Sequence, residues 1–121
     1  MSTIQVNAIQ SSTGTQEVTQ TTIFSGTAKA WADFDQNPTS LDDSFNVSSI
    51  DDDGTGLHGL NFTSSFASTE FAKGGTCEAN GNVCVRNVTE TAGDFSMHTI
   101  TNGGSDNDYN RCSAICVGDL A

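Results

Sequence analysis

The stretch that decides the fold is LDDSFNVSSIDDDGTGLHGLNFTSSF, from Leu41 to Phe66. Two runs in which apolar and polar residues alternate flank three consecutive aspartates and a Gly-Thr-Gly sequence. Alternation with a period of two is typical of a β-strand with one buried face. The central DDDGTG, residues 51–56, therefore stands where a hairpin turn, a metal-binding loop or a phosphate-binding loop could stand.

The spacing of DDDGTG favours the hairpin turn. A calcium loop places its acidic side chains at alternating positions, whereas Asp51, Asp52 and Asp53 are consecutive, so an extended backbone points neighbours to opposite sides. A phosphate-binding loop would continue into Gly-Lys-Ser/Thr and a helix, and neither follows. Asp and Gly between two strands are typical turn residues. We predict a turn, with weak cation binding assisted by neighbouring subunits as the alternative.

The same alternation begins upstream, in TAKAWADF (residues 27–34). One face of this predicted strand is small and apolar, and the other carries Lys29, Trp31 and Asp33. A face of alanines would let a second sheet approach closely. On the opposite face, Trp31 would pack under a loop or at a subunit contact. We expect it to be mostly buried, so that Trp31→Ala costs roughly 3–5 kcal/mol of folding or association free energy. The small apolar face consists of Ala28, Ala30, Ala32 and Phe34.

Further alternating runs continue to the end of the chain, separated by turns rich in Gly, Asn and Asp. SFNVSSI slips register before Ile50, as at a β-bulge, and LHGLNFTSSF aligns Leu60, Phe62 and Phe66. No helix signal is found, and Pro38 lies in the predicted loop DQNPTSLDD. Eight or nine short strands predict an all-β, antiparallel β-sandwich over residues 26–121. The remaining predicted strands are EFAKGGTCEA (70–79), NVCVRNV (82–88), DFSMHTIT (94–101) and RCSAICVGD (111–119).

Residues 1–25 have a different composition from the sandwich region. Apolar residues are spaced through a Gln/Ser/Thr background in which Glu17 is the only charge. Two short extended segments joined by SSTGT (11–15) cannot form a core by themselves. We therefore predict an extended N-terminal arm that needs a partner surface. The candidate assembly residues are Ile4, Val6, Ile9, Val18, Ile23 and Phe24 in the arm and Trp31 in the sandwich.

Composition and charge limit the possible partners. Only 35% of the residues are hydrophobic, below the usual ~45–50%, so we expect the chain to share surface with copies of itself or with a host assembly. Fifteen acidic against four basic residues give a net charge of −11. Binding to nucleic acid or to anionic membranes needs a basic surface, so neither partner is expected. The sequence contains no apolar run that could insert into a membrane and no signal peptide.

No catalytic or cofactor-binding constellation is present in the sequence. His58 and His98 are the only histidines; one stands beside the predicted turn and the other alternates within a strand. Neither the Gly-x-Ser-x-Gly motif nor a local Cys-His signature occurs. Acidic neighbours such as Asp42 and Asp43 are expected to stay solvated and ionised. We therefore expect a protein that is not an enzyme and holds no cofactor or metal.

Four cysteines are the most specific chemistry in the chain: Cys77, Cys84, Cys112 and Cys116. In CEANGNVC a two-residue Asn80-Gly81 turn would place Cys77 opposite Cys84, within the distance of a disulfide. That bond would add roughly 2–3 kcal/mol of stability. Cys112 and Cys116 would lie ~13 Å apart along one strand, so they could bond each other only if the segment coils, or each could bond a hairpin cysteine across strands. Buried free thiols are the alternative, and the spacings fit a zinc site poorly.

A resemblance to a known family rests on GTAKAWADFD and DSFNVSSIDDDGTGLHGLNFTSSF. Its markers are Lys29–Trp31, Ser44–Ile50, the Asp-x-Gly-Thr-Gly turn and the following Leu-Asn-Phe-Thr. This part, residues 26–71, resembles a domain that recurs in tailed bacteriophages, especially aquatic and cyanobacterial ones, at the ends of tail-fibre-like proteins. The opening STIQVNAIQSSTG resembles the N-termini of small phage virion proteins. The resemblance implies a β-rich, usually trimeric protein of the virion surface without enzymatic activity; the four cysteines depart from the common pattern.

Three roles follow as expectations. One small domain preceded by an arm, with Met1 as a natural start, suits a capsid decoration (cement) protein that binds the major capsid protein and stabilises the shell. The resemblance itself favours a tail-fibre or receptor-binding protein. A secreted glycan-binding module would fit the scattered aromatic residues and three Asn-x-Ser/Thr sequons, but the missing secretion signal argues against it.

Overall fold

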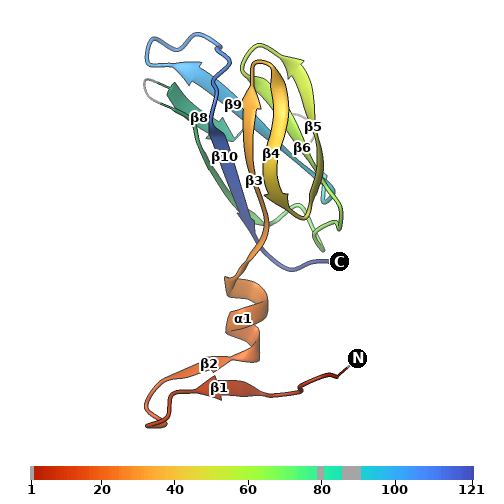
Figure 1. The fold of residues 1–121 in the computed structure, drawn as a ribbon, viewed down its shortest axis with the longest axis vertical. Coiled ribbons are helices and arrows are strands. Elements are labelled where there is room, and N and C mark those ends of the chain that lie inside the picture. Colours follow the sequence, from red (N-terminus) through yellow and green to blue (C-terminus); the bar gives the residue numbers. More distant parts are fainter. Residues whose placement is uncertain (1, 79–80, 86–90) are drawn as a thin grey trace.

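Two four-stranded antiparallel sheets face each other and form a β-sandwich (Figure 1). The structure is a computed structural model that describes residues 2–78, 81–85 and 91–121, with the side chains of residues 84 and 85 excepted. The first sheet has the order β4 (Thr39–Phe45), β3 (Ala28–Gln36), β10 (Cys112–Val117), β7 (Ala72–Thr76). The second has the order β5 (Val47–Gly54), β6 (Leu57–Phe62), β9 (Asp94–Thr101), β8 (Gly81–Val85). The predicted all-β sandwich is confirmed.

The core lies between the inner faces of the two sheets. On β3 the predicted alternation holds, because Ala30, Ala32 and Phe34 are buried while Trp31 is not. The small alanine face admits the opposite sheet, whose Phe95 and other large side chains fill the space. At one end, three phenylalanines make stacked and edge-to-face contacts, which stabilise aromatic clusters beyond their buried area; they are Phe62, Phe66 and Phe71.

The turn between β5 and β6 lies within DDDGTG, but it is shorter than predicted: Asp51–Gly54 belong to β5, and Gly54 pairs with Leu57. The bend occupies only the two residues between them, Thr55 and Gly56. Gly56 has φ +72°, and a Cβ there would meet the carbonyl oxygen of Thr99. Its N–H donates to Asp108 Oδ1 at 2.6 Å, and its carbonyl accepts from the Thr99 N–H at 2.8 Å. Only glycine fits this contact between a turn and a neighbouring strand.

The predicted strand SFNVSSI is instead two strands. Asn46 has φ +59° and makes the corner at which the chain leaves β4 in one sheet and enters β5 in the other. Its side-chain amide spans the corner: Oδ1 accepts from Ser64 N at 2.7 Å, and Nδ2 donates to Ser64 O at 3.0 Å. The expected register slip before Ile50 is present between Val47 and Ser49. Residues 39–43, predicted as loop, belong to β4, and the β3–β4 turn is Asn37-Pro38.

The predicted hairpin at residues 77–84 is not the arrangement in the structure. β7 ends at Thr76 in the first sheet, and β8 begins at Gly81 in the second. Cys84 is paired with His98 of β9 in the second sheet, whereas Cys77 follows β7 of the first sheet. The chain uses this stretch to change sheets, so the register that would oppose Cys77 and Cys84 does not form. The side chain of Cys84 is outside the described residues.

The N-terminal segment, residues 2–26, lies beyond one end of the sandwich (Figure 1). Its two extended pieces pair as a hairpin, β1 (Ala8–Gln10) with β2 (Glu17–Thr19), joined through the SSTGT turn. A short helix follows, α1 (Gln20–Gly26), which the sequence analysis missed. Thr19 caps it, because its Oγ1 accepts from Thr22 N at 3.2 Å. No helix in the described part of the chain is long and apolar enough to cross a membrane.

Candidate functional site

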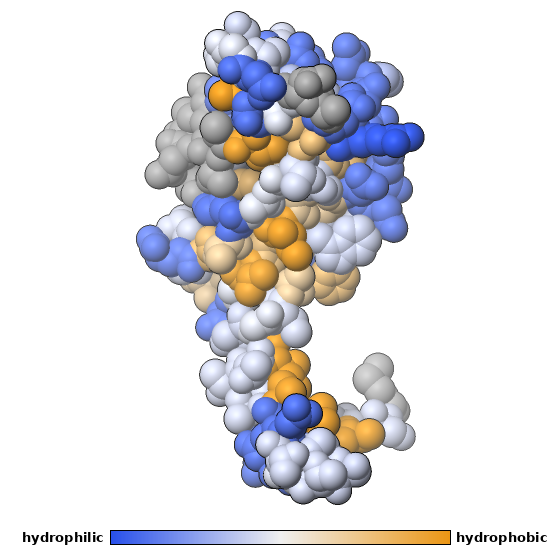
Figure 2. Space-filling view, turned by 90° about the vertical axis from the view of Figure 1, so that its left-hand side faces the viewer, coloured by the Kyte–Doolittle hydropathy of each residue, from blue (hydrophilic) through white to orange (hydrophobic). Residues whose placement is uncertain are grey.

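The N-terminal segment exposes most of its apolar side chains. Figure 2 shows them as a hydrophobic strip below the sandwich. Ile23 is half-buried, and the others are exposed by large fractions: Ile4 87%, Val6 51%, Ile9 57%, Val18 44% and Phe24 58%. Exposed apolar residues gathered in one segment mark a surface that binds a partner. The predicted assembly residues of this segment therefore lie together, and nearly all of them remain open to solvent in the single chain.

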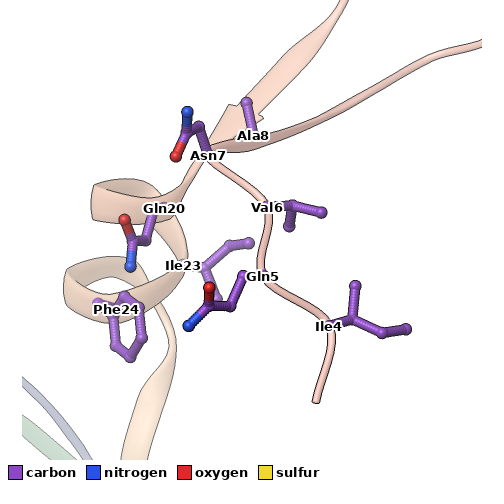
Figure 3. Close-up of a pocket in the computed structure, with 8 residues that line it drawn as sticks. All are labelled: Ile4, Gln5, Val6, Asn7, Ala8, Gln20, Ile23 and Phe24. Carbon is purple, nitrogen blue, oxygen red and sulfur yellow. The ribbon is translucent and has the colours of Figure 1, made fainter. Parts of the chain in front are cut away.

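A hollow of about 650 Å³ lies between residues 4–8 and α1 (Figure 3). Ile23 and Gln5 point toward each other across it, while Val6 and Ile4 project to the side away from the helix. Residues 4–8 thus turn a polar side chain, Gln5, to α1 and the apolar Ile4 and Val6 outward. A partner strand or side chain could bind the outward side without displacing the sandwich.

Two side-chain bonds tie the segment to the sandwich. Ser25 Oγ donates to Asp119 Oδ1 at 3.3 Å, and Lys29 Nζ donates to the carbonyl oxygen of Ile23 at 3.3 Å. Phe24 and Leu120 line a second, smaller hollow at this junction. The junction is held by exposed polar bonds more than by burial, because no residue of α1 is buried.

A second apolar surface crosses the outer face of the first sheet as a row of paired residues. Trp31 of β3 pairs with Phe45 of β4 on one side and with Ile115 of β10 on the other. Ile115 pairs in turn with Gly74 of β7, which has no side chain and leaves a hollow of about 610 Å³ beside the row. We call Phe45, Trp31 and Ile115 the apolar row; their exposed fractions are 53%, 38% and 50%.

Trp31 was predicted to pack either under a loop of its own chain or at a contact between subunits, and the structure corrects the first of these. No loop among the described residues covers this side chain, so the expectation of a mostly buried Trp31 is wrong for the single chain. Burial at a contact between subunits stays a prediction. The row is bordered on the same face by the opposed carboxylates of Asp33 and Asp43, which disfavour a strongly acidic partner surface.

His58 belongs to a buried polar network rather than to a reactive site. Gln36 Nε2 lies 3.0 Å from His58 Nδ1, and Thr39 Oγ1 lies 3.3 Å from His58 Nε2. An amide nitrogen can only donate, so Nδ1 accepts and the ring proton is on Nε2. Gln36 Oε1 accepts from the N–H of Tyr109 at 2.8 Å and lies 2.8 Å from Thr99 Oγ1. The network satisfies the buried polar groups between the sheets, as burial requires.

His98 is on the opposite face of the second sheet, and its Nε2 lies 2.8 Å from Asp106 Oδ1. Because His58 is inward and His98 outward on adjacent strands, the sheet separates the two rings. The neighbouring aspartates Asp51 and Asp52 of β5 have different partners: Asp51 accepts from Asn61 Nδ2 at 2.8 Å, and Asp52 accepts from Gly54 N at 3.0 Å. No group of three or more metal-ligating side chains occurs among the residues that the structure describes.

Three of the four cysteines can be placed with their side chains. Cys112 and Cys116 are fully buried on the inner face of β10, and Cys77 is half-buried against the same core. Burial, followed by nearby Cys77 and the carboxylates of Asp35, Glu78 and Asp33, raises the pKa of Cys112 to about 12. Burial and Glu78 raise the pKa of Cys77. Raised pKa values make both thiols poor nucleophiles at neutral pH.

Sequence reasoning missed Gln36, Thr99 and Tyr109 as the centre of the polar network. The signal was present, since Gln36 continues the inward positions of Ala30, Ala32 and Phe34, where a polar side chain needs a buried partner. Comparisons of the chain with protein-family models, with curated proteins and with solved structures find no match.

Proposed function

We propose that the chain is a non-enzymatic structural protein of a tailed-phage virion. In this proposal it is a capsid decoration protein on the virion surface, bound to the major capsid protein. The N-terminal segment acts as the predicted arm, and the sandwich forms the external knob. The observation that carries the proposal is the exposure of five apolar side chains on a segment that extends beyond its own domain (Figures 1 and 2). The resemblance of residues 26–71 to phage surface domains supports the class.

The free energy of binding would come from the arm. Burying Ile4, Val6, Ile9, Val18 and Phe24 would contribute roughly 1.5 kcal/mol or more for each side chain that becomes fully covered. Glu17 is the only charge in residues 1–25. The arm can therefore approach an acidic shell, or another copy of this chain with its net charge of −11, with little repulsion.

The apolar row would supply the contact between copies. Three neighbouring side chains on three paired strands form a continuous surface, and a homotrimer would cover it on each subunit. The apolar row also fits a second role, that of a tail-fibre or receptor-binding protein. A trimeric tail-fibre tip that binds a host receptor would also bury such a row, and the resemblance favours fibres.

The test uses purified undecorated capsids and two proteins. We expect a chain lacking residues 1–24 to remain a folded β-sandwich and to lose capsid binding, because the apolar anchors are gone. The matched control replaces the exposed polar residues Gln5, Asn7 and Gln16 by serine, which leaves every apolar anchor in place and should preserve binding.

Two outcomes would decide against the proposal. Full binding by the truncated chain would remove the function assigned to the arm. Host-cell binding by an intact chain that ignores capsids would favour the tail-fibre role. Counting copies per particle separates the roles independently, since a shell protein is present in hundreds of copies and a tail protein in at most a few dozen.

A further inference from the structure

Cys77 directly follows β7, and Cys112 is the first residue of β10, the neighbouring strand of the first sheet. The ladder between β7 and β10 ends with Thr76 paired to Ser113. Continuing the antiparallel register by one residue sets Cys77 against Cys112. Directly opposed residues in an antiparallel pair have Cα atoms roughly 4.5–5.5 Å apart, which is within the range that a disulfide spans.

Side-chain bonds on both sides of this pair show that the strands stay together past the last ladder position. Thr76 Oγ1 and Ser113 Oγ are 2.8 Å apart, so this pair meets on the outer face. Glu78 Oε1 accepts from the N–H of Asn110 at 3.2 Å. The two cysteines lie between these contacts. Alternation turns both toward the core, where Cys112 is buried and Cys77 packs against the core cluster.

The surroundings of Cys112 tolerate the loss of its thiol proton. Its Sγ donates weakly to Gln36 Oε1 at 3.5 Å and to the carbonyl oxygen of Tyr109 at 3.4 Å. Gln36 Oε1 has a stronger partner in the Tyr109 N–H, which donates to it at 2.8 Å. Oxidation of Cys112 therefore leaves this buried oxygen hydrogen-bonded, and no desolvation penalty arises from it.

We propose that Cys77 and Cys112 form a cross-strand disulfide when the protein meets a small-molecule disulfide oxidant. The small fraction of Cys77 that is ionised attacks oxidised glutathione slowly, forms a mixed disulfide and releases one glutathione thiolate. The Cys112 thiolate then attacks the Cys77 sulfur, forms the protein disulfide and releases the second glutathione. Two protein thiols lose two protons and two electrons, and one glutathione disulfide gains them. Cys77 reacts first because it is the more exposed of the two.

The proposed bond differs from the other possible pairings. Cys116 is four residues from Cys112 on the same strand, pairs with Lys73, and is too far along β10 to replace Cys112 opposite Cys77. A bond between Cys77 and Cys84 would need the hairpin register, and β7 and β8 belong to different sheets. The bond would join the edge strand β7 to its neighbour β10, one residue beyond the end of the ladder between them.

Peptide mapping separates these pairings directly. The purified chain is incubated with oxidised glutathione, alkylated without reduction in denaturant, and digested with trypsin. Cleavage after Lys73, Arg86 and Arg111 puts Cys77 and Cys84 in one peptide, residues 74–86, and Cys112 and Cys116 in another, residues 112–121. We expect these two peptides to be linked. The link should persist in Cys84→Ser and Cys116→Ser and disappear in Cys77→Ser and Cys112→Ser.

Thermal unfolding gives a second measurement on the same samples. The oxidised chain should melt roughly 10 °C higher than the reduced chain, because a long loop is closed in the unfolded state, and reductant should have no effect on Cys112→Ser. A bond inside peptide 74–86, alkylation of all four cysteines after oxidation, or a link that survives in Cys112→Ser would each overturn the proposal.

Discussion

The sandwich and the N-terminal segment use similar apolar residues in opposite ways. In the sandwich, Phe34 and Phe95 are completely buried between two sheets. In the N-terminal segment, Phe24 and Ile4 are 58% and 87% exposed. The sandwich can bury its side chains because eight described strands give it two facing layers. A two-stranded hairpin and one short helix have no second layer to cover them. The comparison shows that apolar content alone does not make a core; the number of packed layers does.

The largest expected effect tests this contrast with two equivalent substitutions. Phe95→Ala should lower the free energy of unfolding by about 3–5 kcal/mol, because it leaves a cavity between the sheets. Phe24→Ala, its matched control in α1, should change the free energy of unfolding by less than about 0.5 kcal/mol, because its side chain is already exposed. Urea denaturation followed by circular dichroism measures both. Equal losses in the two variants would mean that the N-terminal segment is part of the cooperative fold.

A smaller effect concerns the apolar row, where the sandwich has an exposed surface of its own. Trp31→Ala should lower the free energy of unfolding of a dilute single chain by only about 1–2 kcal/mol, because the side chain is partly exposed. The same change should abolish self-association, measured by analytical ultracentrifugation. Asp33→Asn, two residues along on the same face, is the control that should keep it. Unaltered association in Trp31→Ala would exclude the row as the contact between copies.

Much of the sandwich could be predicted because alternation reports the buried face directly. Residues 94–101 form β9 with the predicted bounds, and Gly56 makes the predicted turn. One error lies within a sheet, where residues 39–43 were predicted as loop and belong to β4. The others occur where the chain changes sheets, at Asn46 and between the end of β7 and the start of β8. Alternation describes each strand but carries no information on which sheet comes next. The CEANGNVC pattern satisfied local hairpin chemistry, but β8 pairs with β9 and β7 pairs with β10, two ladders distant in sequence.

The N-terminal segment was harder to predict for a related reason. The helix α1 carries β-branched Thr21, Thr22 and Ile23, which have modest helix propensity. Its one clear signal is the Thr19 cap, a single side-chain bond. The two candidate surfaces also differ in how far the sequence alone could predict them. The apolar residues of residues 1–25 were identified from composition, whereas the apolar row needed the register that pairs Phe45, Trp31 and Ile115 across three strands.

The smallest expected effect comes from the thiols of the sandwich. It is absent near neutral pH and appears only in alkali. Burial raises the pKa of Cys112 from 9.0 to about 12, and burial also raises that of Cys77. The folded chain therefore holds these protons to higher pH than the unfolded chain does. This contribution to stability is complete below about pH 9 and is lost as the pH rises toward about 12. The free energy of unfolding of the reduced protein should fall across this range.

Controls assign this slope to the two cysteines and to the sandwich. The double variant Cys77→Ser/Cys112→Ser and the oxidised protein should both show a shallower fall than the reduced chain, because neither has these thiols to ionise. Removal of residues 1–24 should leave the slope unchanged, because both cysteines lie in the sandwich. Urea denaturation at a series of pH values from 8 to 11 measures it. An identical slope in the double variant would show that other groups produce the alkaline loss of stability, and a slope that depends on residues 1–24 would show that the two regions are thermodynamically coupled.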